Sequence, residues 1–74
     1  MDSQGSKDKP ATIIHSEYLE CRERIYQGYD LSDQIDQFNN FARGVMAITK
    51  INNEPIELAE LEISKSNKYL DQLK

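Results

Sequence analysis

His15 and Cys21 are the side chains of this sequence best suited to nucleophilic catalysis, because an imidazole can act as a base and a thiolate as a nucleophile. A catalytic pair must lie within hydrogen-bond reach, and the base needs a third group to orient it. His15 and Cys21 are six residues apart, so they would not share one face of a helix. We therefore expect His15 to be structural or exposed, and Cys21 to be a small buried apolar side chain.

The acidic side chains near the C-terminus raise the question of a metal or acid–base site. Glu57, Glu60 and Glu62 lack the Glu-x-x-His spacing of di-iron bundles, and no histidine follows position 15. One histidine and one cysteine also rule out an ordinary zinc site, and the sequence has no phosphate-binding glycine loop or nucleophile elbow. We expect a protein that is not an enzyme and binds no metal or cofactor, with these glutamates on a solvated face.

Arg43 is the only basic residue between Arg24 and Lys50, and it lies in the segment FNNFARG beside Gly44. A guanidinium next to amides and bare backbone could bind a carboxylate or phosphate through two parallel hydrogen bonds. Such an arginine is more often a solvated surface residue or the partner of an acid on a neighbouring helix. The sequence leaves both roles open.

A second line of residues runs along the same segment at spacings of four, three and four, and consists of Asn40, Gly44, Ala47 and Ile51. Glycine inside a helix costs about 1 kcal/mol relative to alanine, which is tolerated more easily where another helix or a ligand approaches the backbone. We predict a second contact face here, used by another protomer, a partner protein or the first helix. The alternative is that Gly44 is an incidental exposed glycine.

Tyr26 and Tyr29 lie on either side of Gly28. Tyrosines beside an irregular point of the chain often form an interface, since they bury much area at low entropic cost and keep a polar tip. They could equally close the end of a helical bundle. Arg43, Gly44, Asn40, Ala47, Tyr26 and Tyr29 are therefore the candidate residues for contact with a partner or ligand.

The charge balance argues against nucleic-acid binding. Nine basic residues face thirteen acidic ones, for a net charge of −4 and no basic run, whereas a phosphate backbone requires clustered lysines and arginines. A DNA-recognition helix presents arginine, lysine, asparagine and glutamine side chains outward, whereas the last predicted helix presents glutamates. The segment MDSQGSKDKPA has no apolar region of the kind found in signal peptides, and no segment approaches the apolar length of a membrane span. The single cysteine cannot form an internal disulfide. These features predict a soluble cytoplasmic protein that does not contact membranes.

Three helices are predicted to position these residues, over about 16–27, 31–51 and 54–73. Residues 1–12 are polar and aperiodic, which predicts a disordered tail before a single helical domain at 13–74. We expect Gly28 to end the first helix and Asp30 to cap the second. The apolar pattern also continues in phase through Gly28, so one long helix across this point is the alternative.

Each predicted helix carries an apolar stripe at alternating spacings of three and four. The stripes are Ile14, Tyr18, Cys21 and Ile25; then Leu31, Ile35, Phe38, Ala42, Val45 and Thr49; and finally Ile56, Ala59, Ile63, Ser66, Leu70 and Leu73. Asn52 and Asn53 are expected to form the second turn, with Asn53 or Glu54 capping a helix that Pro55 starts. Equal helix lengths and a short turn predict an antiparallel hairpin of 31–51 and 54–73.

The sequence thus predicts an all-α fold, in which a shorter N-terminal helix folds against the hairpin or is swapped between protomers. A chain of 74 residues buries only about 60% of its unfolded surface, so we expect self-association to complete the bundle. The leading functional hypothesis is a small non-enzymatic protein that binds another protein as an inhibitor, adaptor or assembly factor. The alternative is an oligomer that binds a small anionic ligand, such as a nucleotide, in pockets between protomers.

Overall fold

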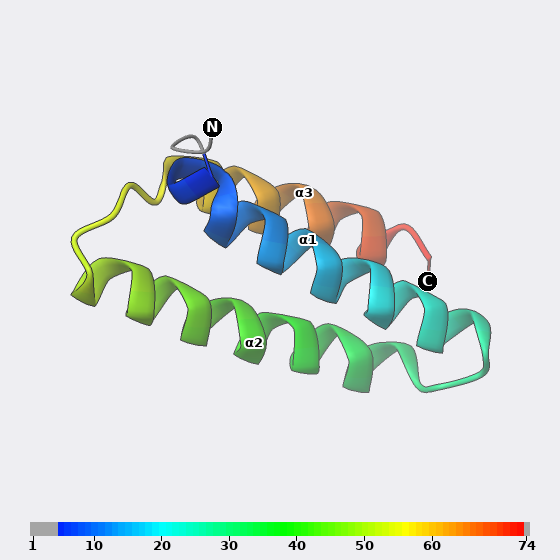
Figure 1. Ribbon diagram of the computed structural model, residues 1–74. Helices are drawn as coiled ribbons and strands as arrows, with labels where there is room; N and C mark the ends of the chain where they lie inside the picture. Colours follow the sequence, from blue (N-terminus) through cyan, green and yellow to red (C-terminus); the bar gives the residue numbers. More distant parts are fainter. Residues whose placement is uncertain (1–4, 74) are drawn as a thin grey trace.

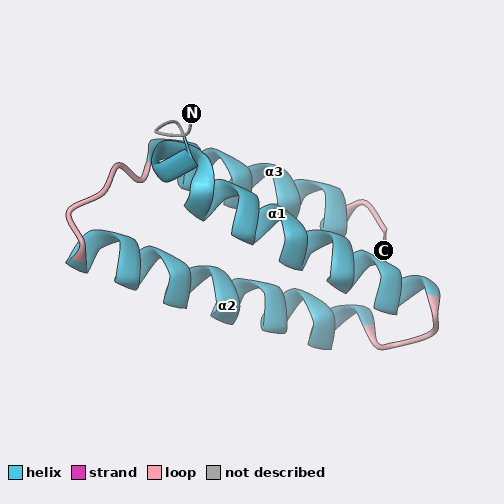
Figure 2. Ribbon diagram, viewed as in Figure 1, coloured by secondary structure: helices cyan, strands magenta, loops and turns pink. Residues whose placement is uncertain are grey.

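The protein is built from three α-helices, as a computed structural model that describes residues 5–73 shows (Figures 1 and 2). Helix α1 comprises Gly5–Tyr26, α2 comprises Leu31–Ile51 and α3 comprises Glu57–Asp71. No strand occurs within the described residues. The all-α prediction is confirmed, and the bounds of the second helix agree with those expected.

Helix α1 is the centre of the bundle. It packs against both α2 and α3, whereas α2 and α3 contact each other only slightly. The chain runs along α1, returns along α2 and then follows the direction of α1 again in α3, so successive helices are antiparallel (Figure 1). We had expected the last two helices to form a close hairpin with a shorter helix added to it. Instead α1, with 22 residues, is the longest helix and joins the other two.

The first helix begins at Gly5 and not near Ser16. Residues 5–12, which we predicted as part of a polar tail, form its first turns, while residues 1–4 lie outside the described part. Pro10 is buried one turn before Ile14, so the apolar face of the helix continues N-terminal to the predicted start. This burial outweighs the low intrinsic helix propensity of proline.

The core is formed where the three apolar stripes meet. Its buried members are Ile14, Tyr18 and Cys21 of α1, Phe38 and Ala42 of α2, and Ala59 and Leu70 of α3, all of which belong to the predicted stripes. Two buried hydroxyls have partners within their own helices. Thr49 Oγ1 donates to the carbonyl oxygen of Val45 at 2.7 Å, and Ser66 Oγ donates to Glu62 Oε2 at 3.1 Å. Their burial therefore leaves no hydroxyl unpaired.

Helix α1 ends at Gly28, whose positive φ is one that glycine adopts without strain. Gly28 has φ +107°, and the N–H groups of Gly28 and Tyr29 donate to the carbonyls of Ile25 and Arg24, both at 3.0 Å. This is the Schellman arrangement, in which a left-handed residue closes the helix. Asp30 then caps α2 by accepting from the N–H of Asp33 at 3.2 Å. The predicted break is confirmed, and the alternative of one continuous helix is wrong.

Helix α2 ends in the same way, with Asn53 at φ +57° in the left-handed position. The N–H of Glu54 donates to the carbonyl of Thr49, and that of Asn53 to Lys50, both at 3.0 Å. The predicted turn at Asn52 and Asn53 is therefore confirmed.

The predicted start of the third helix at residue 54 is wrong. Helix α3 begins at Glu57, after Ile56, which makes no side-chain capping bond, and it has 15 residues. The residue before a proline is disfavoured in the helical region, so Glu54 and Pro55 are better suited to the connection. These residues carry the chain from the end of α2 to the start of α3 (Figure 1).

Gly28 and Gly44 offer a matched pair of substitutions. Gly28→Ala is expected to lower the free energy of unfolding by about 1–2 kcal/mol, because a side chain is strained at this φ although no atom lies within 4 Å. Gly44→Ala is expected to raise it by up to about 1 kcal/mol, because Gly44 is helical and its Cβ would also meet open space. Urea denaturation of both variants measures the difference. Equal effects at the two positions would contradict this account of the turn.

Candidate functional site

An open groove separates α2 from α3, because α1 holds the two helices while they scarcely touch each other. The groove has a volume of about 490 Å³ and is lined by Asn39, Ala42, Arg43, Met46, Ala47, Lys50 and Ile63. Two of the residues predicted to contact a partner or ligand, Arg43 and Ala47, thus lie in one groove. Ile63 is the only lining residue from α3 among the described residues.

A pair of asparagines bridges α2 and α3 at this groove. Asn39 Nδ2 donates to Asn67 Oδ1 at 3.0 Å, and Asn67 Nδ2 donates to Asn39 Oδ1 at 2.9 Å. Each amide also donates to the carbonyl four residues earlier in its own helix, that of Ile35 at 3.0 Å and that of Ile63 at 3.1 Å. Reciprocal bonds of this kind require the two side chains to lie at one level, so they fix the register of α2 against α3.

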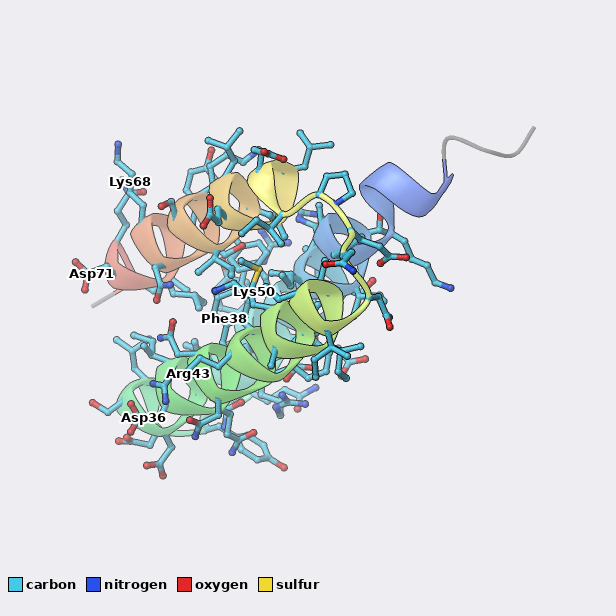
Figure 3. All side chains as sticks on the ribbon, turned by 90° about the vertical axis from the view of Figure 1, so that its left-hand side faces the viewer. Asp36, Phe38, Arg43, Lys50, Lys68 and Asp71 are labelled. Carbon is cyan, nitrogen blue, oxygen red and sulfur yellow. The ribbon has the colours of Figure 1, made fainter. Side chains whose placement is uncertain are left out.

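The α2 side of the groove is basic. Arg43 and Lys50 both line it, and Figure 3 shows Arg43 on the outer side of α2 and Lys50 toward the space between the helices. Within residues 5–73, neither side chain makes an ion pair with an acid. Of the two roles left open for Arg43, pairing with an acid of a neighbouring helix in the same chain is therefore not observed. Arg43 thus lines the groove from the outer side of α2, without an acidic partner among residues 5–73.

Asn40, Gly44 and Ile51 lie outside this groove, on the back of α2. All three are exposed, Ile51 to 78%, and a Cβ added at Gly44 would have no neighbour within 4 Å. The first helix does not use this face, since it packs against the opposite stripe of α2. Contact with another protomer or a partner protein at this face stays a prediction.

Tyr26 and Tyr29 flank the turn between α1 and α2 and are 66% and 56% exposed. They do not close the end of the bundle, because most of each ring faces solvent. Arg43 lies 12 residues along α2 from its first residue, Leu31, which places it about 18 Å from that turn. The structure therefore does not bring these tyrosines together with Arg43.

A second groove, between α1 and α2, was not predicted. It has a volume of about 250 Å³ and is lined by Lys9, Pro10, Ile13, Val45, Ile48, Thr49, Asn52 and Glu54. Its apolar residues are partly open to solvent, with Ile13 37% and Ile48 61% exposed. Ile48 lies next to Thr49 of the predicted stripe, but the α1 wall of the groove lies partly in residues we predicted as a tail.

Arg24 connects α1 to the start of α2. Its Nε donates to Gln34 Oε1 at 2.7 Å, and Gln34 is almost fully buried. Its Nη2 donates to Glu17 Oε2 at 3.4 Å and to Cys21 Sγ at 3.5 Å. Sequence reasoning missed Gln34, which lies one position before Ile35 of the predicted stripe and has no apolar character to reveal its burial.

Cys21 and His15 take up separate positions with different partners. Cys21 is fully buried, as predicted, and its pKa is raised by burial and then by the negative charge of Glu17, which disfavours the reactive thiolate. His15 is half exposed, and its Nδ1 lies 2.9 Å from Glu62 Oε2 on α3. Both residues therefore connect or fill the bundle, and the structure does not pair them.

Within residues 5–73, no group of three or more histidine, cysteine, aspartate or glutamate side chains is arranged to hold a metal ion. None of the three helices combines the length and apolarity that crossing a membrane requires. Comparison of the chain with protein-family models, curated protein sequences and solved structures found no match. The chemistry of the grooves between the helices therefore rests on their own residues.

The asparagine bridge leads to a double-mutant cycle. Asn39→Leu is expected to lower the free energy of unfolding by about 1–2 kcal/mol, because it leaves the partly buried amide of Asn67 without its partner. The double variant Asn39→Leu/Asn67→Leu is expected to recover part of this loss, giving a coupling energy of at least about 0.5 kcal/mol by chemical denaturation. Asn40→Leu, on the exposed back of α2, is the matched control. Additive effects of the two changes would show that the bridge does not couple the helices.

Proposed function

We propose that this is a small non-enzymatic protein that binds a helix of another protein in the groove between α1 and α2. The observation that carries the proposal is the contiguity of the exposed apolar side chains there. Ile13, Val45 and Ile48 line a single groove, whereas isolated apolar residues are normal on any surface. A continuous apolar groove between two helices suits the apolar face of a third.

The energetics support a helix as the ligand of this groove. Ile48 is 61% exposed and Ile13 is 37% exposed, so docking would remove a large part of both side chains from water. Complete burial of an isoleucine side chain contributes about 1.5–3 kcal/mol, which makes these two residues the expected centre of the contact. Lys9 and Glu54 also line the groove and can supply its polar rim.

The test compares two equally exposed apolar residues on different faces. Ile48 and Leu61 are 61% and 62% exposed, but only Ile48 lines the groove between α1 and α2. A protein captured by affinity pull-down is purified, and its dissociation constant for the chain is measured by calorimetry. Ile48→Asp is expected to weaken binding at least about tenfold, since it places a charge in an apolar contact, while Leu61→Asp leaves it unchanged.

Two results would overturn this proposal. One is a partner whose affinity is unaffected by Ile48→Asp in a variant that circular dichroism shows to be folded. The other is an equal loss of affinity with Leu61→Asp, which would place the contact on another face.

A second function is favoured by one observation, that Arg43 and Lys50 line the same groove between α2 and α3 without acidic partners in the described chain. The groove, covered by a second protomer, could hold a small anionic ligand such as a nucleotide. A guanidinium and an ammonium near amides are suited to phosphate recognition.

Thermal unfolding with and without ATP or inorganic phosphate tests this second function. A ligand that binds only the folded chain raises the midpoint of unfolding, by an amount set by its concentration relative to its dissociation constant. Arg43→Gln is expected to abolish that rise, while Lys65→Gln, an exposed cation outside this groove, is expected to retain it. Absence of any rise in the unaltered chain with either anion would contradict the hypothesis.

A further inference from the structure

The groove between α2 and α3 has opposite charges on its two sides. On α2, Arg43 and Lys50 line it. On α3, Glu60 lies about 60° and Glu57 about 120° from Ile63 around the helix, both on the side away from the residues that face α1, by the rotation of 100° per residue. We propose that a second copy of the chain docks on this groove, with the basic side of each copy against the acidic side of the other.

The asparagine bridge sets the levels at which these charges lie. Because Asn39 and Asn67 are bonded side by side and α2 runs antiparallel to α3, each step forward along α2 corresponds to one step back along α3. Arg43 is therefore level with position 63, about 4.5 Å from the level of Glu60. Lys50 is level with position 56, next to Glu57. Lys50 thus has Glu57 within one residue of its level, and Glu60 lies less than one helical turn from the level of Arg43.

A two-fold axis parallel to the helices brings the cations of α2 in one copy opposite the glutamates of α3 in the other. Rotation about such an axis, placed along the groove, sets α2 of one copy over α3 of the other and keeps every residue at its own level. Arg43 then faces the partner's Glu60, and Lys50 faces the partner's Glu57. Each contact occurs twice, so the dimer contains four pairs of opposite charge.

The other end of the groove carries mixed charge on α3. Asp36 lies two helical turns before Arg43, and its level on α3 falls between Lys68 and Asp71. Figure 3 shows Asp36, Arg43, Lys68 and Asp71 on one side of the molecule. The opposition of charge therefore rests on Arg43 and Lys50 of α2 and the glutamates of α3.

The competing face-to-face arrangement has its axis across the helices and sets α2 against α2. With the axis at the level of Arg43 it opposes the two guanidinium groups, and charges of one sign directly opposite each other disfavour association. With the axis midway between Asp36 and Arg43 it opposes these two residues instead. Exchange of charge between Arg43 and Glu60 distinguishes the arrangements, because only the parallel axis brings these two residues together.

The apolar floor of the groove would complete a four-helix core. Met46 and Ile63 are half-buried, and Ala42 and Ala47 are small enough for helices to approach closely. Helix α3 is about 22 Å long, so two adjacent helices of about 10 Å width present a face of roughly 440 Å² in projection. This is a small interface by the standard of stable complexes, so we expect a dimer with a dissociation constant in the micromolar range.

The test is a charge exchange measured by sedimentation equilibrium of the full chain, from about 1 to 200 μM, a range chosen around the expected affinity. Arg43→Glu alone and Glu60→Arg alone are each expected to weaken the dimer about tenfold or more, because each changes two symmetric contacts. The double variant Arg43→Glu/Glu60→Arg is expected to restore it. Lys65→Glu, on an exposed part of α3 outside the groove, is the control and should have little effect.

Three outcomes would overturn the proposal. They are a folded monomer at the highest concentration, a dimer that neither single exchange weakens, and a double variant no better than the single ones. Both exchanged residues are exposed, and circular dichroism verifies that each variant is folded. Ile48→Asp is expected to leave this dimer intact, so failure of the helix-binding function and failure of the dimer are distinguishable.

Discussion

The burial of one stripe of α1 between the other two helices is the constraint on which this structure depends. Ile14, Tyr18 and Cys21 are buried against residues of both α2 and α3, while α2 and α3 have little contact of their own. Since apolar burial is the main favourable term in folding, α1 must occupy the centre. The same geometry leaves α2 and α3 apart, and the groove between them is its direct consequence.

Polar contacts then decide how the helices are aligned around α1. Arg24 joins α1 to α2 through Gln34, His15 joins α1 to α3 through Glu62, and the bridge of Asn39 and Asn67 joins α2 to α3. Hydrophobic contact has no direction, so by itself it permits helices to slide and rotate. Paired hydrogen-bonding groups permit one alignment, because displacement leaves donors and acceptors without partners. Each helix pair has one such contact, which makes the register, and hence the levels of the surface charges, a property of the fold.

Features that depend on local chemistry could be predicted from the sequence. The bounds of α2, the glycine turn at Gly28 and the buried stripes follow from periodicity, capping and left-handed preference, all of which act within a few residues. The start of α1 was missed because burial of Pro10 depends on a distant helix. The central place of α1 was missed because a stripe shows which face is buried but not which helix covers it. The sequence singled out Arg43 and Ala47 because both lie on α2 alone. It did not predict the groove between α1 and α2, because that groove depends on how the two helices pack.

Arg43 is the residue for which anion binding competes with the dimer that pairs it with Glu60. A second protomer could cover a bound anion only in an arrangement other than that dimer. A guanidinium that forms two parallel bonds with the partner's Glu60 cannot offer the same donors to a phosphate. If both a dimer and an anion complex form, each must weaken the other by the same factor, since coupling between two binding equilibria is reciprocal. An anion would then act as a dissociating ligand, and the glutamates of α3 would be its competitor. The groove between α1 and α2 lies outside this competition, because Arg43 and Glu60 take no part in its lining.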